Sequence, residues 1–598
     1  GLVVAALYAY PLLRTLHTVG AMIVPPTWAP ELHFYLVLSQ IEMGGDGMVA
    51  NPWYGYPLPF GEAPYLRFGL ALRTFGYLSA WLGDITLSVL LWHVIWTTLI
   101  YLTALAFLRS VLPERGRGLL AAVLAAAVLL GGLSPGSVIA VAKELIGFGD
   151  RINSGSLPYA RVFYPQVAVP LMFGYAALQI RALSQKSRAP WVGMALLQTV
   201  AFLAYPYAAL WMAAVTGIAV LAQALLRPSA VCWRVIGTFT LACATADVLY
   251  LSISGAPYTG LYHADRVLVD FDIARAADVY LQVLLRMLIA TGVALLFWRG
   301  TRIEINIALL ALGFATTLLL FADMVFSPLL RIRHHMQFLT SPIAQILGAY
   351  AGGRCLLIVW RGSAATKRWL LSMYLMAIIA LGLIMTDMDY ERSLPFNREQ
   401  AGLAHMVSGL DMNERSLVVA PTESYEGASL WMPLVSSARV LYVHHGEFIL
   451  PRQDYRCHRI RQAMYLYLTG RDTAWLKDIL TDPMPRETQY LFETREERVL
   501  IESGRYAEGM QSMVEQLLPH LESIERDAPE TRQFFAGYES VIVLDRKTNP
   551  LFRTARLGRY LKFVEGMDNG TFTASRYVRR PAPRASAKEW TKTAWDCK

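Results

Sequence analysis

Long apolar stretches alternate with short polar ones through residues 1–387. A helix needs about 20 apolar residues to cross the hydrocarbon core of a bilayer. The pattern therefore predicts a polytopic α-helical membrane protein with about eleven spans, at 1–24, 84–111, 118–141, 166–183, 190–205, 207–226, 234–254, 279–298, 304–326, 338–360 and 368–387. The first range shows no signal-peptide cleavage pattern, so we expect it to be an anchor.

The pattern changes to that of a soluble domain over residues 388–598. Apolar residues at helical spacing predict helices at 457–468, 474–480 and 509–525, and short β-branched runs predict strands at 416–420, 440–443 and 541–544. We therefore expect a mixed α/β domain that ends in a basic Pro/Ala-rich tail. Asn569-Gly570-Thr571 also matches an N-glycosylation sequon.

Composition excludes a soluble multidomain enzyme, since 55% of the residues are hydrophobic, only 17% are charged and the mean hydropathy is +0.37. The net charge of +9 does not indicate nucleic-acid binding, because Arg and Lys gather in short loops between apolar ranges. By the positive-inside rule these basic loops are cytoplasmic: 113–117, 181–188, 227–234, 299–302 and 361–368.

The opposite, extracytoplasmic face then carries the longer loops, at 25–83, 142–166, 255–278 and 327–337. An odd number of spans places the C-terminal domain on the same side. We expect a multi-pass protein of a bacterial inner or plasma membrane. Cysteine spacing supports no zinc or iron–sulfur site, while a disulfide between Cys457 and Cys597 stays an open alternative.

The first outer loop combines acids with aromatic residues. Glu31 lies where the chain should leave the bilayer, and a carboxylate there could deprotonate a hydroxyl acceptor. Tyr35, Trp53 and Tyr54 could pack on a sugar ring, and His33 could act as a base or metal ligand. The structural alternatives are a solvated carboxylate, an interfacial aromatic belt and a packed histidine.

The second outer loop carries Asp150 and Arg161 shortly before an apolar range. The arginine could hold a phosphate, and the acid could complete either a divalent-metal site or a sugar-hydroxyl site together with the first loop. The alternative is that both side chains only anchor the chain at the membrane surface.

A cluster of cations enters the tenth apolar range on the outer side, where the positive-inside rule predicts few: Arg331, Arg333, His334 and His335. Such a cluster could neutralise the phosphate of a lipid carrier in a low-dielectric cleft. Pairing with Asp323 or with loop acids is the structural alternative.

Taken together, these features resemble the GT-C superfamily of polyprenyl-phosphate-sugar-dependent glycosyltransferases. The first loop has an acid, a tyrosine four residues later, glycines and a proline turn in the order found in that superfamily: Glu31, Tyr35, Gly44-Gly45 and Asn51-Pro52. The late basic segment that leads to Pro342 is similar to the segment that grips the carrier phosphate in the superfamily.

The resemblance implies an inverting transfer of sugar from a polyprenyl-phosphate carrier to a glycan, lipid or protein acceptor. Glu31 would be the catalytic base, and Arg331, Arg333, His334 and Arg161 would hold the leaving phosphate. Glu replaces the usual Asp, and the first loop has no Asp-x-Asp pair, so no metal ligands are assigned and a divalent metal stays an open alternative.

Two other classes keep the same architecture. A non-catalytic accessory subunit of an envelope polysaccharide or secretion assembly would use its loop acids only for solvation. A flippase or transporter ranks below both, because the apolar ranges hold few charged residues (Asp247, Arg286 and Asp323) and show no paired inverted repeat.

Overall fold

The structure is a computed structural model. It describes residues 1–19, 69–114, 118–133, 166–228 except 186, 273–320, 332–359, 363–422, 428–443, 455–481 and 505–579 except 528, with shorter pieces between them. Contacts divide the chain into a membrane unit (Gly1–Ala29, Phe68–Tyr262 and Asp272–Pro395) and a C-terminal unit (Pro30–Arg67, His263–Phe271 and Phe396–Lys598).

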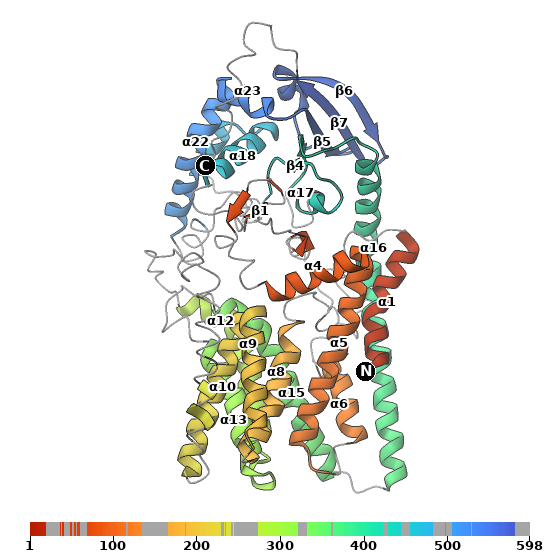
Figure 1. The fold of residues 1–598 in the computed structure, drawn as a ribbon, viewed down its shortest axis with the longest axis vertical. Helices are drawn as coiled ribbons and strands as arrows, with labels where there is room; N and C mark the ends of the chain where they lie inside the picture. Colours follow the sequence, from red (N-terminus) through yellow and green to blue (C-terminus); the bar gives the residue numbers. More distant parts are fainter. Residues whose placement is uncertain are drawn as a thin grey trace. The chain divides into compact units, whose positions relative to one another are not determined.

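The membrane unit is built of helices (Figure 1). Within it α5 packs against α1, α6 and α8, and α15 packs against α12 and α13. Every expected apolar range contains a described helix except 234–254, most of which lies outside the described residues. The helices are α1 (Leu2–Val19), α4 (Leu70–Leu82), α5 (Ile85–Val111), α6 (Leu119–Leu129), α8 (Ala168–Ser184), α9 (Ala189–Ala204), α10 (Pro206–Leu226), α12 (Ile273–Leu295), α13 (Ile303–Leu320), α15 (Ile332–Val359) and α16 (Ala364–Ser408), with a short 3₁₀ turn η5 (Trp298–Gly300).

Five of the described helices are long and apolar enough to cross a membrane: Leu2–Val19, Ile85–Val111, Pro206–Leu226, Leu339–Val359 and Ala365–Met388. Four further apolar helices are shorter, at Leu119–Leu129, Ala189–Ala204, Leu284–Leu295 and Ile303–Leu319. A multi-pass membrane protein is therefore what the described helices indicate, while the number eleven stays a prediction.

Helix α4 lies within a range that we expected to be loop. Its buried residues, Ala71, Leu72, Phe75 and Ser79, recur at helical spacing, while Tyr77 and Trp81 are exposed on the other side. Gly83 ends the helix with φ of 65°, a left-handed conformation that glycine adopts without steric cost. Asp84 then caps α5, because its carboxylate accepts from the backbone N–H groups of Thr86 and Leu87.

Helix α16 is continuous over 45 residues and contains the boundary between the two units at Pro395. Its middle is tied to α1 by Arg14, which pairs with Asp387 and with Glu391 at 3.3 Å and lies 3.9 Å from the Tyr390 ring centroid. The helix thus continues past about Tyr390, where the composition becomes polar. Its charged residues there have a partner on α1, so the helix does not end at this point.

The C-terminal unit contains a five-stranded mixed sheet with the order β4-β3-β5-β7-β6 (Figure 1). Its parallel part pairs β3 with β4 and β5, and its antiparallel part pairs β7 with β5 and β6. This confirms a sheet-containing domain after the helical region. The strands are β3 (Ser416–Val419), β4 (Arg439–Val440), β5 (Ser540–Arg546), β6 (Leu561–Asp568) and β7 (Phe572–Arg579). A separate two-stranded sheet pairs β1 (Met48–Ala50) with β2 (Pro57–Pro59).

Helices pack on the five-stranded sheet to form the core of the unit. Helix α22 contributes Met510, Met513, Leu517, Leu521 and Ile524, whose spacing of three or four residues places them on one face. The remaining helical elements are α17 (Ala428–Trp431), η7 (Met432–Leu434), α18 (Tyr455–Leu468), α19 (Thr473–Asp478), α22 (Tyr506–Glu525), α23 (Pro529–Ala536) and η10 (Thr554–Arg559).

The hairpin of β6 and β7 was absent from our expectations. Its turn is Asn569-Gly570, a strong hairpin signal that also falls within the glycosylation sequon. Gly570 has φ of 90°, and the Asn569 side chain accepts from the backbone N–H groups of Thr571 and Phe572 at 3.1 and 2.7 Å. The tripeptide therefore has a structural reason to be present.

Cysteine pairing differs between the two units. Cys457, at the start of α18, is disulfide-bonded. Cys243 and Cys355, both in the membrane unit, are not part of a disulfide. The sequence left a disulfide at Cys457 open, and Cys597 as its partner stays an open alternative.

Candidate functional site

Most of the residues predicted from the sequence to form the site lie outside the described residues. These are the proposed base and its neighbours in the first loop, both residues singled out in the second loop, and the first arginine of the late cluster: Glu31, His33, Tyr35, Asp150, Arg161 and Arg331. Their roles stay predictions. Among the described residues, no three His, Cys, Asp or Glu side chains gather to hold a metal ion.

The late basic cluster meets a helix earlier than expected. Helix α15 begins at Ile332, so the backbones of Arg333 and His334 belong to its first turn, although we had placed a loop over 327–337. The cations therefore sit on the beginning of a helix whose later turns, from Leu339, are long and apolar enough to cross a membrane.

Trp53, predicted to contact substrate, lies inside the C-terminal unit. Its side chain is 0% exposed, and its indole Nε1–H donates to the carbonyl oxygen of Leu430 at 2.8 Å. The Trp53 carbonyl in turn accepts from the backbone N–H of Val440 in β4 at 2.8 Å. These contacts anchor the first loop to the five-stranded sheet of the same unit.

Tyr54 continues this anchor with 3% of its surface exposed. Its hydroxyl accepts from the backbone N–H of Val443 at 3.2 Å and lies 3.2 Å from Nδ1 of His458. The Arg461 guanidinium carbon lies 4.7 Å from the ring centroid, within the range of a cation–π contact. Burial of both aromatic residues favours an anchoring role for them, and a role in substrate binding stays a prediction.

A buried polar network lies in the membrane unit, and sequence analysis did not identify it. The Gln166 side-chain Nε2 lies 3.1 Å from His93 Nδ1, on α5, and 3.2 Å from the Tyr159 carbonyl oxygen. The Tyr159 hydroxyl donates to Oε1 of Gln345, on α15, at 2.6 Å. The network thus joins α5, the loop over 142–166 and α15.

The contacts of Gln166 fix the tautomer of His93. A carbonyl oxygen can only accept, so the atom of Gln166 that faces the Tyr159 carbonyl must be the amide nitrogen. That nitrogen also donates to Nδ1 of His93, which leaves the imidazole hydrogen on Nε2. The network therefore presents His93 Nε2–H as a donor and Gln166 Oε1 as an acceptor.

Neither of these two atoms has a hydrogen-bond partner within the part of the chain that the structure describes. Both residues are deeply buried, since His93 is 2% and Gln166 0% exposed. Leaving a buried polar atom unpaired costs about 1–3 kcal/mol. A donor and an acceptor kept open at that cost are suited to a group that both accepts and donates, such as a hydroxyl.

Tyr159 bonds to both Gln166 and Gln345, and its backbone conformation is strained. Its φ is 66°, a left-handed conformation that is rare for a bulky aromatic residue and costs about 1–3 kcal/mol. Burial raises the pKa of its phenol, which keeps the hydroxyl protonated as a donor to Gln345. Strain of this kind persists only where surrounding contacts impose it, and it is typical of functional sites.

A weak signal for the network was present in the sequence. His93 is an ionisable residue within the apolar range 84–111, and such residues are functional candidates by default. The other three members are uncharged, and no spacing rule connects them.

Comparison with known proteins gives little beyond this geometry. No family model matches the chain, and no curated protein matches it by sequence. A solved structure of an archaeal oligosaccharyltransferase, AglB from Archaeoglobus fulgidus in complex with an inhibitory peptide and a dolichol-phosphate, is similar over 87% of this chain and 72% of that one, at 10% identity and a TM-score of 0.36. A likeness at that score assigns neither activity nor ligands.

Proposed function

We propose that this chain is an inverting glycosyltransferase that moves a sugar from a polyprenyl-phosphate carrier to an extracytoplasmic glycan, lipid or protein. The observation that carries the proposal is the hydrogen bond between Tyr159 and Gln345. It joins the loop that bears Arg161 to the helix that bears Arg333 and His334, the two segments that we expect to hold the carrier phosphate.

The chemistry needs one base and one anion site. Glu31 would take the proton of the acceptor hydroxyl while its oxygen attacks the anomeric carbon and the bond from that carbon to the phosphate oxygen breaks. Arg161, Arg331 and Arg333 would stabilise the charge that develops on the departing polyprenyl phosphate, with His334 as a further donor. No metal ion is needed for these roles, and a divalent ion at Asp150 stays an alternative.

The polar network would act as a positioning element in this scheme. Tyr159 precedes Arg161 by two residues, and Gln345 follows the basic cluster along α15. A network that fixes both segments would fix the spacing of their cations, and a displacement of about 1 Å at a reacting centre can cost about a hundredfold in rate.

Two features support the extracytoplasmic side for the C-terminal unit. The unit carries a disulfide at Cys457, and disulfides persist in oxidising compartments. Trp53 and Tyr54 bring part of the first loop into the same unit, which supports one side of the membrane for the loop and the C-terminal unit. The bias of Arg and Lys toward the alternate loops assigns that side to the exterior.

The test is sugar transfer from a panel of radiolabelled polyprenyl-phosphate sugars by the purified full chain. Glu31→Gln is nearly isosteric and should lower transfer by about 10²-fold or more, because general-base catalysis contributes about 10²–10⁴. Glu42→Gln changes another carboxylate of the same loop and should leave transfer unchanged.

The possible outcomes distinguish a wrongly assigned base, a folding defect and a non-catalytic accessory subunit. Active wild type with an equally active Glu31→Gln protein would mean that the class is right and the base is wrong. Loss in both Glu31→Gln and Glu42→Gln with lower melting temperatures would indicate a folding defect of the loop. Transfer from no donor in the panel would favour an accessory subunit of an envelope assembly.

A further inference from the structure

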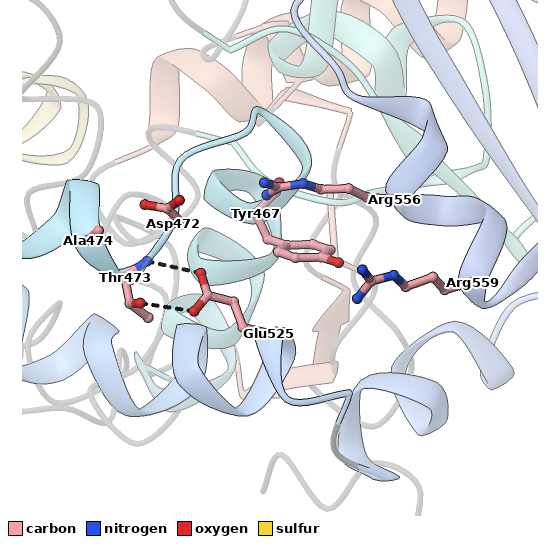
Figure 2. A pocket seen from close by; sticks show the side chains of 7 residues that line it. All are labelled: Tyr467, Asp472, Thr473, Ala474, Glu525, Arg556 and Arg559. Carbon is pink, nitrogen blue, oxygen red and sulfur yellow. Dashed lines mark hydrogen bonds between the residues drawn. The ribbon is translucent and has the colours of Figure 1, made fainter.

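The C-terminal unit contains a polar cavity of about 340 Å³ that the proposed transfer reaction does not use (Figure 2). It lies where the end of α18, the start of α19, the end of α22 and η10 meet. Six polar side chains line it: Tyr467, Asp472, Thr473, Glu525, Arg556 and Arg559. Its volume is at the lower end of the range for small-molecule sites, about 300–1,000 Å³.

One wall of the cavity is basic. The Arg556 guanidinium donates to the carbonyl oxygen of Tyr467 and lies 4.5 Å from the centroid of the Tyr467 ring, so its position is fixed. Arg559 points toward the hydroxyl end of Tyr467 (Figure 2). Among the described residues it forms no hydrogen bond or ion pair, although Asp527 lies near enough for the two charges to interact, so its N–H donors remain open to a ligand.

The opposite wall carries two carboxylates whose orientation is set by backbone groups (Figure 2). Glu525 accepts from the backbone N–H of Thr473 at 3.0 Å and from its hydroxyl at 2.9 Å. Asp472 caps α19 and accepts from the backbone N–H of Trp475 at 2.9 Å. An ionised carboxylate has about four lone-pair sites, so both can accept further hydrogen bonds from hydroxyl groups.

The two walls do not neutralise one another. Among the described residues, no ion pair joins Arg556 or Arg559 to Asp472 or Glu525, although together they carry two positive and two negative charges. A ligand with anionic groups throughout would be repelled by the carboxylates, and an apolar ligand would leave all four charges unpaired. The arrangement suits a molecule that is anionic at one end and rich in hydroxyl groups at the other.

We propose that this cavity binds an anionic saccharide unit, with the carboxylate of a uronic acid on Arg559 and the ring hydroxyls on Asp472 and Glu525. A charge-assisted hydrogen bond from a guanidinium fork accounts for the anionic end, and carboxylate acceptors account for the hydroxyl end. The proposal does not depend on the transfer reaction, because binding can be measured without a donor.

The test compares three probes with the purified full chain by isothermal titration calorimetry: glucuronate, glucose and acetate. Glucuronate differs from glucose only by a carboxylate in place of the terminal hydroxymethyl group, and acetate supplies a carboxylate without the sugar. We expect glucuronate to bind at least about tenfold more tightly than either, because it alone engages both walls. Equal binding of glucose, or equal binding of acetate, would overturn the proposal.

Variants assign the binding to this cavity. Arg559→Gln should weaken glucuronate binding by about tenfold or more. It should leave the melting temperature nearly unchanged, since Arg559 is exposed and solvent screens its interaction with Asp527. Arg559→Lys should recover part of the affinity because it keeps the charge without the fork. Arg415→Gln alters an exposed arginine elsewhere in the unit and should have no effect. Unchanged binding in Arg559→Gln would refute the site.

Discussion

Each unit of this protein contains a buried polar cluster, and the two clusters differ in how completely they are bonded. In the C-terminal unit, Arg459 pairs with Glu497, donates to Gln462 at 2.7 Å and donates to Gln516 at 3.1 Å, so all three guanidinium nitrogens are used. In the membrane unit, His93 and Gln166 bond to each other and leave one donor and one acceptor open.

The number of unbonded donors and acceptors distinguishes a cluster with a structural role from one with a functional role. A buried cluster whose donors and acceptors are all used holds its surroundings in one arrangement and has nothing left to offer a ligand. A cluster with open atoms costs stability that only a binding partner or a reaction would recover. The comparison therefore predicts that substitutions in the first cluster change stability, while substitutions in the second change activity.

The largest expected effect is on the closed cluster. Glu497→Gln would leave the Arg459 charge buried without its counterion and should lower the free energy of unfolding by about 3–5 kcal/mol. Chemical denaturation of the purified protein would measure this. Glu539→Gln, which breaks an exposed pair with Arg415, is the control and should leave stability unchanged. If Glu497→Gln lowers the free energy of unfolding no more than Glu539→Gln does, this cluster does not have a structural role.

The next effect concerns the open cluster. His93→Asn keeps an acceptor near the position of Nδ1 for Gln166 but has no atom at the position of Nε2, so transfer should fall by about 10- to 100-fold at an unchanged melting temperature. His93→Gln places a donor near the Nε2 position and should restore part of the rate. If both variants melt early and keep the wild-type rate per folded molecule, the open cluster is structural like the other.

A smaller effect tests the link between the loop and α15. Tyr159→Phe removes the hydroxyl that donates to Gln345, and Gln345→Leu removes the acceptor. A double-mutant cycle of unfolding free energies should give a coupling of about 1 kcal/mol, the usual net value of one hydrogen bond. Additive effects of the two substitutions would show that the bond is not formed in solution.

The smallest effect is a pH dependence from Asp545, which accepts from the backbone N–H groups of Arg546, Leu551 and Phe552 at 2.9, 2.8 and 2.8 Å. Burial raises the pKa of this carboxyl above the ordinary 3.8, despite the opposing effect of those hydrogen bonds. A raised folded-state pKa contributes stability that is present below the ordinary pKa and is lost as the pH rises through the raised value.

Asp545→Asn should therefore be less stable than the wild type at low pH, because the N–H of Phe552 loses its acceptor, and this deficit should narrow as the pH rises above about 4. Unfolding curves of both proteins across that range would measure it. Exposed acids such as Asp568, whose pKa is lowered chiefly by its hydrogen bond with Lys547, act equally in both proteins and cancel. A widening deficit would reverse the sign of the assigned shift.

Local patterns predicted much of the fold. The apolar spacing of α22 and the β-branched run of β5 are written in consecutive residues, and both elements lie where the sequence placed them. The end of the membrane unit was harder to predict, because α16 continues beyond its apolar part where Arg14 binds its middle. The β6–β7 hairpin was missed because its turn signal at Asn569-Gly570 was given another interpretation.

The site was much less predictable, for a physical reason. His93 and Gln166 are 73 positions apart, and Tyr159 and Gln345 are 186 apart, so only the packing of α5 and α15 brings the four side chains into one network. Trp53 shows the same limit of sequence-based prediction, because its residue type was informative and its partner was not predictable. Its aromatic character was evident, but its partner Leu430 lies 377 positions away.

The separation of Trp53 and Leu430 along the chain has a consequence for biosynthesis. Trp53 emerges from the ribosome 377 residues ahead of Leu430, which at about 5–20 residues per second is an interval of about 20 to 75 s. During that interval the Trp53 side chain, which is buried in the folded protein, cannot yet pack against the C-terminal unit. The C-terminal unit, for its part, would lack its indole if it were produced as 396–598 alone. Maturation of this protein thus has to keep its first loop from misfolding until the residues around Leu430 have been translated.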